Sequence, residues 1–281
     1  MSRISSAILT LLISATAVAD DKPKPEASSA DRLAAIQKEH TAAEVAYFKA
    51  AEALTDTPEG NKKSEELYKA FDKGQAARFL KAVELAKTDP KSDVAFTALE
   101  WVLTIVRSYY LPAGNPALEL MKEHHAANPY VGKIVAWVGY YTPHEKYNPK
   151  EHEAAMALIK AVAAKNPSRV ARGQAVMALA WQAKGKFAVA EYKNAPDREK
   201  LAAEAEKAFE AVLKDYADCP RLMREDARLL GDEAKQELFE LRHLRIGKVA
   251  PDIGDEDLDG VKFKLSDYLG KIVVINFWGD W

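Results

Sequence analysis

The stretch that decides the fold class is residues 197–216, DREKLAAEAEKAFEAVLKDY, in the second half of the chain. Apolar side chains recur in it at intervals of three and four residues, and Lys and Glu side chains fill most positions between them. The residues that share the apolar face are Leu201, Ala205, Phe209, Val212 and Tyr216. This spacing predicts an amphipathic helix whose apolar stripe packs against a neighbouring element.

The same helical period continues from residue 29 to about residue 241, and Gly and Pro fall almost only between the apolar segments. Five pairs combine a turn-forming side chain with a proline suited to a first helical turn, and each marks a helix boundary. These pairs are Asp89–Pro90, Asn115–Pro116, Asn128–Pro129, Asn148–Pro149 and Asn166–Pro167. The sequence therefore predicts a mainly α chain, with helices of about 10 to 25 residues over residues 30–245.

Part of this region is similar to tetratricopeptide repeats. Residues 185–190, GKFAVA, resemble that family's G-x-Y-x-x-A turn and the start of its second helix. Ala205, Phe209 and Pro220 resemble its later positions, but an insertion over residues 191–199 interrupts the pattern and no period of 34 residues recurs. We therefore expect a solenoid-like helical array, tetratricopeptide-like in part, that can present a concave surface to a protein partner.

The composition narrows the class of function. With 40 Lys and Arg against 42 Asp and Glu, the net charge is −2, which argues against a nucleic-acid binder that works through a basic face. Cys219 is the single cysteine, so neither an intramolecular disulfide nor a zinc site made of several thiolates is available. Neither a cofactor motif nor a phosphate loop is present in the sequence.

The N-terminus has the pattern of a secretory signal. Arg3 precedes an apolar run over residues 7–13, and Ala17–Val18–Ala19 supplies the small residues that a signal peptidase accepts. We expect residues 1–19 to be cleaved, residues 20–29 to form a flexible leader, and the product to be exported, periplasmic or extracellular. An uncleaved membrane anchor is the alternative, and no other stretch is long and apolar enough to span a membrane.

Several polar residues could suggest other chemistry. His152–Glu153 begins an H-E-x-x-H zinc pattern, but Met156 stands where the second histidine would be, so a metalloprotease is not expected. His124–His125 comes late in a predicted helix, where a cation is favoured by the helix dipole.

Aromatic residues cluster at helical spacing, and packing between helices is their expected use, with a ligand platform as the alternative. They are Trp101, Trp137, Tyr109, Tyr110, Tyr140 and Tyr141. Cys219, next to Pro220, has no basic residue reliably placed beside it to lower its pKa, so we expect a passive thiol there.

After residue 245 the pattern changes to that of strands. Residues 253–257 and 261–265 read as two strands, and Asp259–Gly260 between them is a hairpin signal because both residues tolerate positive φ. Ser266–Asp267 can cap a short turn or helix. Residues 272–278, IVVINFW, are a nearly continuous apolar run, which is typical of a strand covered on both faces of a sheet.

Residues 246–281 resemble the opening of a redoxin domain of the TlpA-like and AhpC/TSA thioredoxin-fold families. The resemblance rests on GKVAPDI (247–253), DLDG (257–260), LSD (265–267), GK (270–271) and VINFWGDW (274–281). It implies the truncated N-terminal part of a thioredoxin-like α/β domain. In those families the last of these motifs is followed by C-x-x-C, or by a single peroxidatic cysteine, so no catalytic residue is expected within the 281 residues and the redox centre is expected immediately after Trp281.

The sequence ends where those families place the nucleophilic residue. We interpret this end as a possible UGA codon that encodes selenocysteine but was taken for a stop codon. A frameshift, a nonsense mutation or the end of a contig are the alternatives. Two functions stay open: an exported thiol-disulfide oxidoreductase with an antioxidant or disulfide-exchange role, and a helical protein-binding module with a redoxin remnant. The first implies protein thiols or disulfides as partners, and the residues do not separate a disulfide reductase from a peroxidase.

Overall fold

A computed structural model describes residues 27–105, 112–142, 145, 148–222 and 228–276. The described residues are mainly helical, with nine α-helices followed by a two-stranded hairpin and a short 3-10 helix. The helices are α1 (Ser29–Glu52), α2 (Pro58–Thr88), α3 (Asp93–Thr104), α4 (Gly114–His125), α5 (Gly132–Tyr140), α6 (Pro149–Lys165), α7 (Arg169–Tyr192), α8 (Arg198–Tyr216) and α9 (Leu230–His243). The C-terminal elements are β1 (Gly254–Glu256), β2 (Lys262–Lys264) and η2 (Leu265–Tyr268). The predicted signal peptide, residues 1–19, and most of the predicted leader, residues 20–29, lie outside the described residues.

Local sequence explains where the helices begin. Hydroxyl side chains precede four helices and accept a hydrogen bond from a backbone N–H of the first turn, which satisfies one of the donors left open there. They are Ser28, Thr57, Ser92 and Ser168, before α1, α2, α3 and α7. Asn148 occupies the N-cap position of α6 without a side-chain hydrogen bond, and Pro149 is the first residue of the helix. Each of the five predicted boundary pairs lies between two helices or in a first turn, so these boundaries are confirmed.

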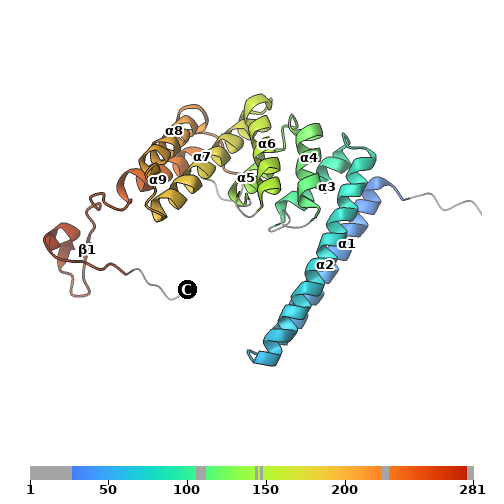
Figure 1. The fold of residues 1–281 in the computed structure, drawn as a ribbon, viewed down its shortest axis with the longest axis horizontal. Helices are drawn as coiled ribbons and strands as arrows, with labels where there is room; N and C mark the ends of the chain where they lie inside the picture. Colours follow the sequence, from blue (N-terminus) through green and yellow to red (C-terminus); the bar gives the residue numbers. More distant parts are fainter. Residues whose placement is uncertain (1–26, 106–111, 143–144, 146–147, 223–227, 277–281) are drawn as a thin grey trace, which may run out of the picture.

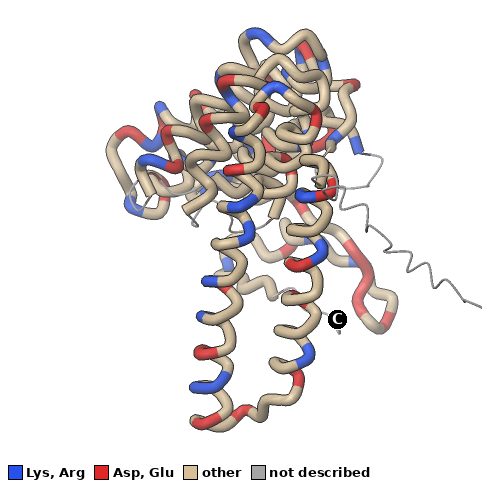
Figure 2. Tube along the Cα trace, turned by 90° about the vertical axis from the view of Figure 1, so that its right-hand side faces the viewer, with Lys and Arg blue, Asp and Glu red and all other residues tan. Residues whose placement is uncertain are grey.

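The helices follow one another along an elongated row (Figure 1). Most pack mainly against a neighbour in sequence, but α5 packs mainly against α7, and α4 packs against α6 as well as α3. Helices two apart in sequence also touch: α3 contacts α5, α5 contacts α7 and α7 contacts α9. α1 and α2 form a long pair whose far end projects from the row (Figure 1), and charged residues occur along both helices (Figure 2). No helix within the described ranges is both long and apolar enough to cross a membrane.

The core consists of two clusters of buried apolar side chains. Phe79, Leu99 and Leu103 are among the largest in the first cluster, which extends from α1 to α7. Phe209 and Leu230 belong to the second, which joins α7, α8 and α9. α7 contributes to both clusters, so it connects the two halves of the row.

The predicted helix over residues 197–216 is confirmed, but the repeat-like turn at residue 185 is wrong. α8 begins after Asp197, buries Ala205, Phe209 and Val212, and half-buries the two ends of the predicted stripe. Gly185 lies inside the continuous helix α7, which ends only at Tyr192. The chain turns instead at residues 193–197, where Asn194 has a positive φ of 49°. Two helices fall outside the predicted length range, since α2 has 31 residues and α5 has 9.

Candidate functional site

The C-terminal segment forms the predicted hairpin. β1 and β2 pair antiparallel, with Asp255 opposite Phe263. The turn is organised by Asp257, whose carboxylate accepts hydrogen bonds from the backbone N–H of Asp259 (3.0 Å) and of Val261 (2.8 Å). Gly260 has φ +77°, which is the left-handed conformation that a glycine adopts without strain. The Asp259–Gly260 signal is therefore confirmed as a hairpin turn.

A second carboxylate ties the segment before β1 to the 3-10 helix after β2. Asp252 accepts one hydrogen bond from the backbone N–H of Ser266 and one from its hydroxyl, each 2.8 Å long. Both bonds lower the pKa of Asp252, and the bond from the backbone N–H of Ser266 has the larger effect. Asp267 caps the same turn by accepting from the backbone N–H of Lys264 at 2.8 Å. Each end of the hairpin is thus held by polar contacts.

The predicted buried-type strand over residues 272–278 does not form within the described residues. Residues 272–276 have no strand partner, and Ile272 and Val274 are 98% and 89% exposed. Residues 277–281 lie outside the described part of the chain. The physical reason is that a strand needs hydrogen-bonding neighbours and covered faces, and the two-stranded hairpin supplies neither.

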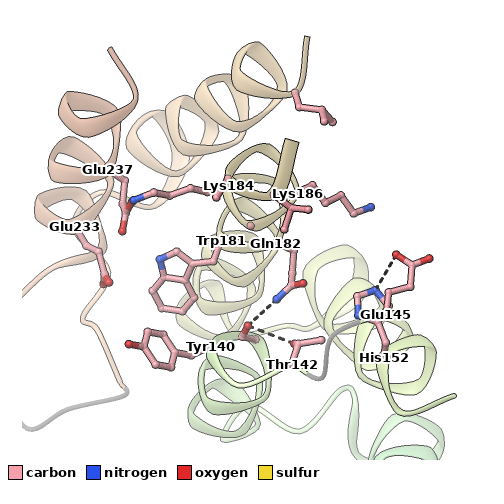
Figure 3. A pocket seen from close by; sticks show the side chains of 15 residues that line it. Tyr140, Thr142, Glu145, His152, Trp181, Gln182, Lys184, Lys186, Glu233 and Glu237 are labelled. Carbon is pink, nitrogen blue, oxygen red and sulfur yellow. Dashed lines mark hydrogen bonds and ion pairs between the residues drawn. The ribbon is translucent and has the colours of Figure 1, made fainter. Parts of the chain in front are cut away.

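A pocket of about 730 Å³ opens in the helical row and is lined by residues of α5, α6, α7, α8 and α9 (Figure 3). Tyr140, at the end of α5, and Trp181, on α7, meet edge to face, with ring centroids 5.6 Å apart and planes at 80°. Gln182 donates from Nε2 to the carbonyl of Gly139 at 2.9 Å, which fixes the end of α5 against α7.

Ion pairs line the α9 side of this pocket. Lys184 on α7 donates to Glu237 and, at 2.6 Å, to Glu240. Burial lowers the pKa of Lys184, but the hydrogen bonds that it donates to both carboxylates, together with their charges, outweigh this effect and the net shift is upward. The same contact with Lys184 lowers the pKa of Glu240. One turn before Glu237, Glu233 pairs with the buried Arg221 at 3.5 Å.

His152 lies at the opposite edge of the pocket. Its Nε2 is 3.9 Å from a carboxylate oxygen of Glu145. Glu153 is exposed and Met156 is half-buried against the core, so the partial zinc pattern reads as one turn of α6. Among the residues with described positions, no group of three or more His, Cys, Asp or Glu side chains is arranged to hold a metal ion.

The helix-dipole explanation for the His124–His125 pair is wrong for His125. Although it lies in the last turn of α4, His125 is only 5% exposed and packs edge to face on Phe96, 5.4 Å away. Burial is the main cause that lowers its pKa, so the neutral form is favoured there. His124 lies 3.8 Å from Glu123 on the partly exposed side.

The aromatic residues have different uses. Trp101 on α3 packs against Phe79 on α2 at 5.0 Å, as expected for packing between helices, whereas Trp137 stacks on Tyr141 at 5.2 Å within α5 and its C-cap. Tyr140 is 52% exposed and faces the pocket. Tyr109 and Tyr110 lie outside the described residues.

Cys219 does have a basic neighbour, contrary to the sequence-based expectation. Arg169, at the start of α7, places Nη1 3.4 Å from Sγ while it pairs with Asp218 at 2.6 Å. The thiol is 1% exposed, and burial raises its pKa more than Arg169 lowers it. The thiol is therefore protonated at neutral pH, which is what a passive role requires.

Sequence reasoning missed residues whose partners are distant in the chain. Trp181, Lys184 and Glu237 were not singled out, because no local pattern brings α7 and α9 together. The same holds for Arg78, whose Nε donates to Nδ1 of the buried His40 at 3.4 Å. Burial first, and then the charge of Arg78, lower the pKa of His40.

A short segment of the chain is similar to thiol-disulfide oxidoreductases. Over 38 residues it is 50% identical to thiol-disulfide oxidoreductase ResA of Bacillus thuringiensis subsp. konkukian (strain 97-27), which is 14% of this chain and 22% of that protein. Over 36 residues it is 53% identical to the ResA of Geobacillus kaustophilus (strain HTA426), covering 13% and 21%. The chain thus spans about a fifth of the length of these curated relatives. No protein-family model and no solved structure matches the chain.

Proposed function

We propose that residues 246–281 are the opening of a thioredoxin-like domain in an exported thiol-disulfide oxidoreductase. The observation that carries the proposal is the similarity to ResA at 50% identity or more. We assign the matched segment to the end of the chain, because residues 246–281 are the part that resembles a redoxin domain. The confirmed hairpin agrees with this assignment.

The exposed run Ile272–Ile275 gives physical support. Four consecutive apolar side chains in water lose the burial free energy that a sheet would supply, about 25 cal/mol for each Å² of apolar surface. Further strands and covering helices of a thioredoxin-like domain would bury this run on both faces. The helical row then precedes the redox domain and acts as its docking or dimerisation part.

The chemistry is thiol-disulfide exchange at a centre that the resemblance places directly after Trp281. A thiolate there attacks one sulfur of a substrate disulfide and forms a mixed disulfide, and the other substrate sulfur leaves as a thiolate. A second thiol then attacks the mixed disulfide and releases the reduced substrate. Two protein thiols are oxidised to a disulfide and one substrate disulfide is reduced to two thiols.

The nucleotide sequence beyond codon 281 is the first test. A Cys-x-x-Cys sequence in frame supports the proposal, and so does UGA followed in frame by a resolving cysteine, as expected for selenocysteine. A nucleotide sequence that continues with neither of these two patterns, in any reading frame, contradicts the proposal.

The second test is an insulin-reduction assay on the 281-residue chain and on the product of the extended frame. We expect activity only in the extended product, and loss of that activity when the first cysteine or selenocysteine is replaced by serine. Inactivity of both products favours the alternative function, a helical protein-binding module, for which the pocket of about 730 Å³ is the specific observation.

Export is tested separately, by the mass of the N-terminal peptide. A mature chain that begins at Asp20 in the periplasmic or secreted fraction supports cleavage after Ala19. An intact Met1 in the membrane fraction supports the anchor instead.

A further inference from the structure

The pocket in the helical row has a feature that thiol-disulfide exchange does not use. Tyr140 and Trp181 form a corner of two nearly perpendicular rings, and Glu233 and Glu237 lie on the α9 side of Trp181 (Figure 3). Aromatic faces and carboxylates share one preference, because the faces of the rings carry partial negative charge and the carboxylates carry full charge. The corner is therefore a place for a positive charge.

The corner is held in place before any ligand arrives. The ring of Tyr140 packs edge to face on Tyr141 at 4.9 Å, and Tyr141 stacks on Trp137 at 5.2 Å. Trp181 is half-buried against the second core cluster. Rings fixed in this way lose little conformational freedom on binding, which favours affinity.

The charges of the pocket argue against an anion. Lys184 is already satisfied by two carboxylates, and its pKa is raised by them, so it is not available to a further negative group. The carboxylates are paired as well, Glu233 with Arg221 and Glu237 with Lys184, but Lys184 is shared with Glu240, so this cluster keeps one net negative charge. A cationic ligand restores the balance, whereas an anionic ligand adds to the excess.

The size of the pocket argues for more than a simple ion. Its volume, about 730 Å³, lies within the range of about 300–1,000 Å³ that is common for sites binding small organic ligands. That space holds a long side chain together with the polypeptide backbone on either side of it. We propose that this pocket binds a lysine or arginine side chain of a partner polypeptide, with the cationic group in the corner against the two rings, on the pocket side of their contact. The site goes beyond the redox function and does not depend on it.

The test uses the 281-residue chain and fluorescein-labelled hexapeptides, measured by fluorescence anisotropy. One peptide carries adjacent arginine and lysine. A second has citrulline and acetyl-lysine at the same positions, with nearly the same shape and no charge, and a third has two glutamates. We expect the cationic peptide to bind about fivefold to thirtyfold tighter than the neutral one, and more weakly as salt is raised. Equal binding of the first two, preference for the glutamate peptide, or no binding of any peptide overturns the proposal.

Variants locate the binding. Tyr140→Leu removes one ring from an exposed position and should weaken binding of the cationic peptide about fivefold or more, whereas Tyr140→Phe keeps the ring and should bind as the unaltered chain does. Tyr130→Leu is the matched control, because Tyr130 is 77% exposed and lies outside the pocket. If Tyr140→Leu, with an unchanged circular dichroism spectrum, binds as tightly as Tyr130→Leu, the site is not where we place it.

Discussion

Replacing Gly139 with alanine should destabilise the protein, because α5 and α7 approach most closely at this glycine. A β-carbon at position 139 would lie 2.2 Å from Cβ and 3.1 Å from Cα of Ala178. Carbon atoms in contact are about 3.5–4.0 Å apart, so the two helices would have to separate. A methyl group attached directly to the backbone of α7 cannot rotate out of the way.

The magnitude follows from two opposing effects. Overpacking of a core contact costs about 1–3 kcal/mol, and the upper end applies here because the obstacle is a helix backbone and its β-carbon. Alanine in a helix is about 1 kcal/mol more favourable than glycine. We therefore expect a net loss of about 2 kcal/mol in the free energy of unfolding.

Gly185 provides the matched control on the same helix pair. It lies inside α7, and a β-carbon there would meet nothing within 4 Å. Gly185→Ala should therefore raise the free energy of unfolding by up to about 1 kcal/mol. Adding Ala178→Gly to Gly139→Ala removes the colliding methyl group and should restore part of the lost stability.

Urea unfolding followed by circular dichroism at 222 nm measures these differences as shifts of the midpoint. The expected order of stability is Gly185→Ala, unaltered chain, Gly139→Ala. If Gly139→Ala were as stable as Gly185→Ala, the close approach of α5 and α7 would be incorrect, and with it the placement of Tyr140 against Trp181.

Three further predictions concern other parts of the chain. Asn166→Leu should cost about 1–3 kcal/mol in urea unfolding, because the side chain is 1% exposed and its amide group donates to the carbonyls of Ala126 and Asn128, of which Asn128 keeps a second partner in the N–H of Val131; an unchanged midpoint would exclude these bonds. Because the pKa of His40 is lowered in the folded protein, the unfolded chain binds the proton first as the pH falls below about 6.5, so stability decreases there with falling pH. His40→Gln should make the urea midpoint depend less on pH in this range. If the midpoint of the variant changed with pH as steeply as that of the unaltered chain, the prediction would be contradicted. Ile272→Lys with Val274→Lys should lower the fluorescence of a hydrophobic dye without shifting the urea midpoint of the helices, and a shifted midpoint would mean that this run packs on them.

The sequence could predict those features that depend on neighbouring residues. The boundary at Asn148–Pro149 and the buried face of α8 follow from local rules of capping and periodicity. The turn at Asp259–Gly260 follows from the positive φ that such a turn needs. In each case the residues that decide the structure lie within one or two turns of each other.

Gly185 shows where local reasoning fails. Glycine in a helix costs only about 1 kcal/mol relative to alanine, so a glycine does not by itself end a helix. The residues that follow, Phe187 and Ala190, are buried on α7, and their packing more than offsets that cost. Tertiary packing therefore decides that the helix continues to Tyr192.

The pocket could not be predicted for a related reason. Tyr140, Trp181 and Glu237 come from three helices, and their proximity depends on the close approach of α5 and α7 at Gly139. The contact of Arg169 with Cys219 likewise joins residues 50 positions apart. Neither arrangement has a signature in spacing, since each is set by how whole helices pack.

The helical row and the C-terminal segment differ in what holds them together. The row buries many of its large apolar side chains in two clusters that α7 connects, so its stability comes from contacts within the described chain. The hairpin buries none of its strand residues, and a two-stranded hairpin alone is marginally stable in water. Its order comes from polar contacts such as Asp252 with Ser266, each of which contributes about 1 kcal/mol at most for exposed groups. Covering Ile272–Ile275 would add the burial that the hairpin lacks, and under the proposed function further strands of the same sheet would supply it.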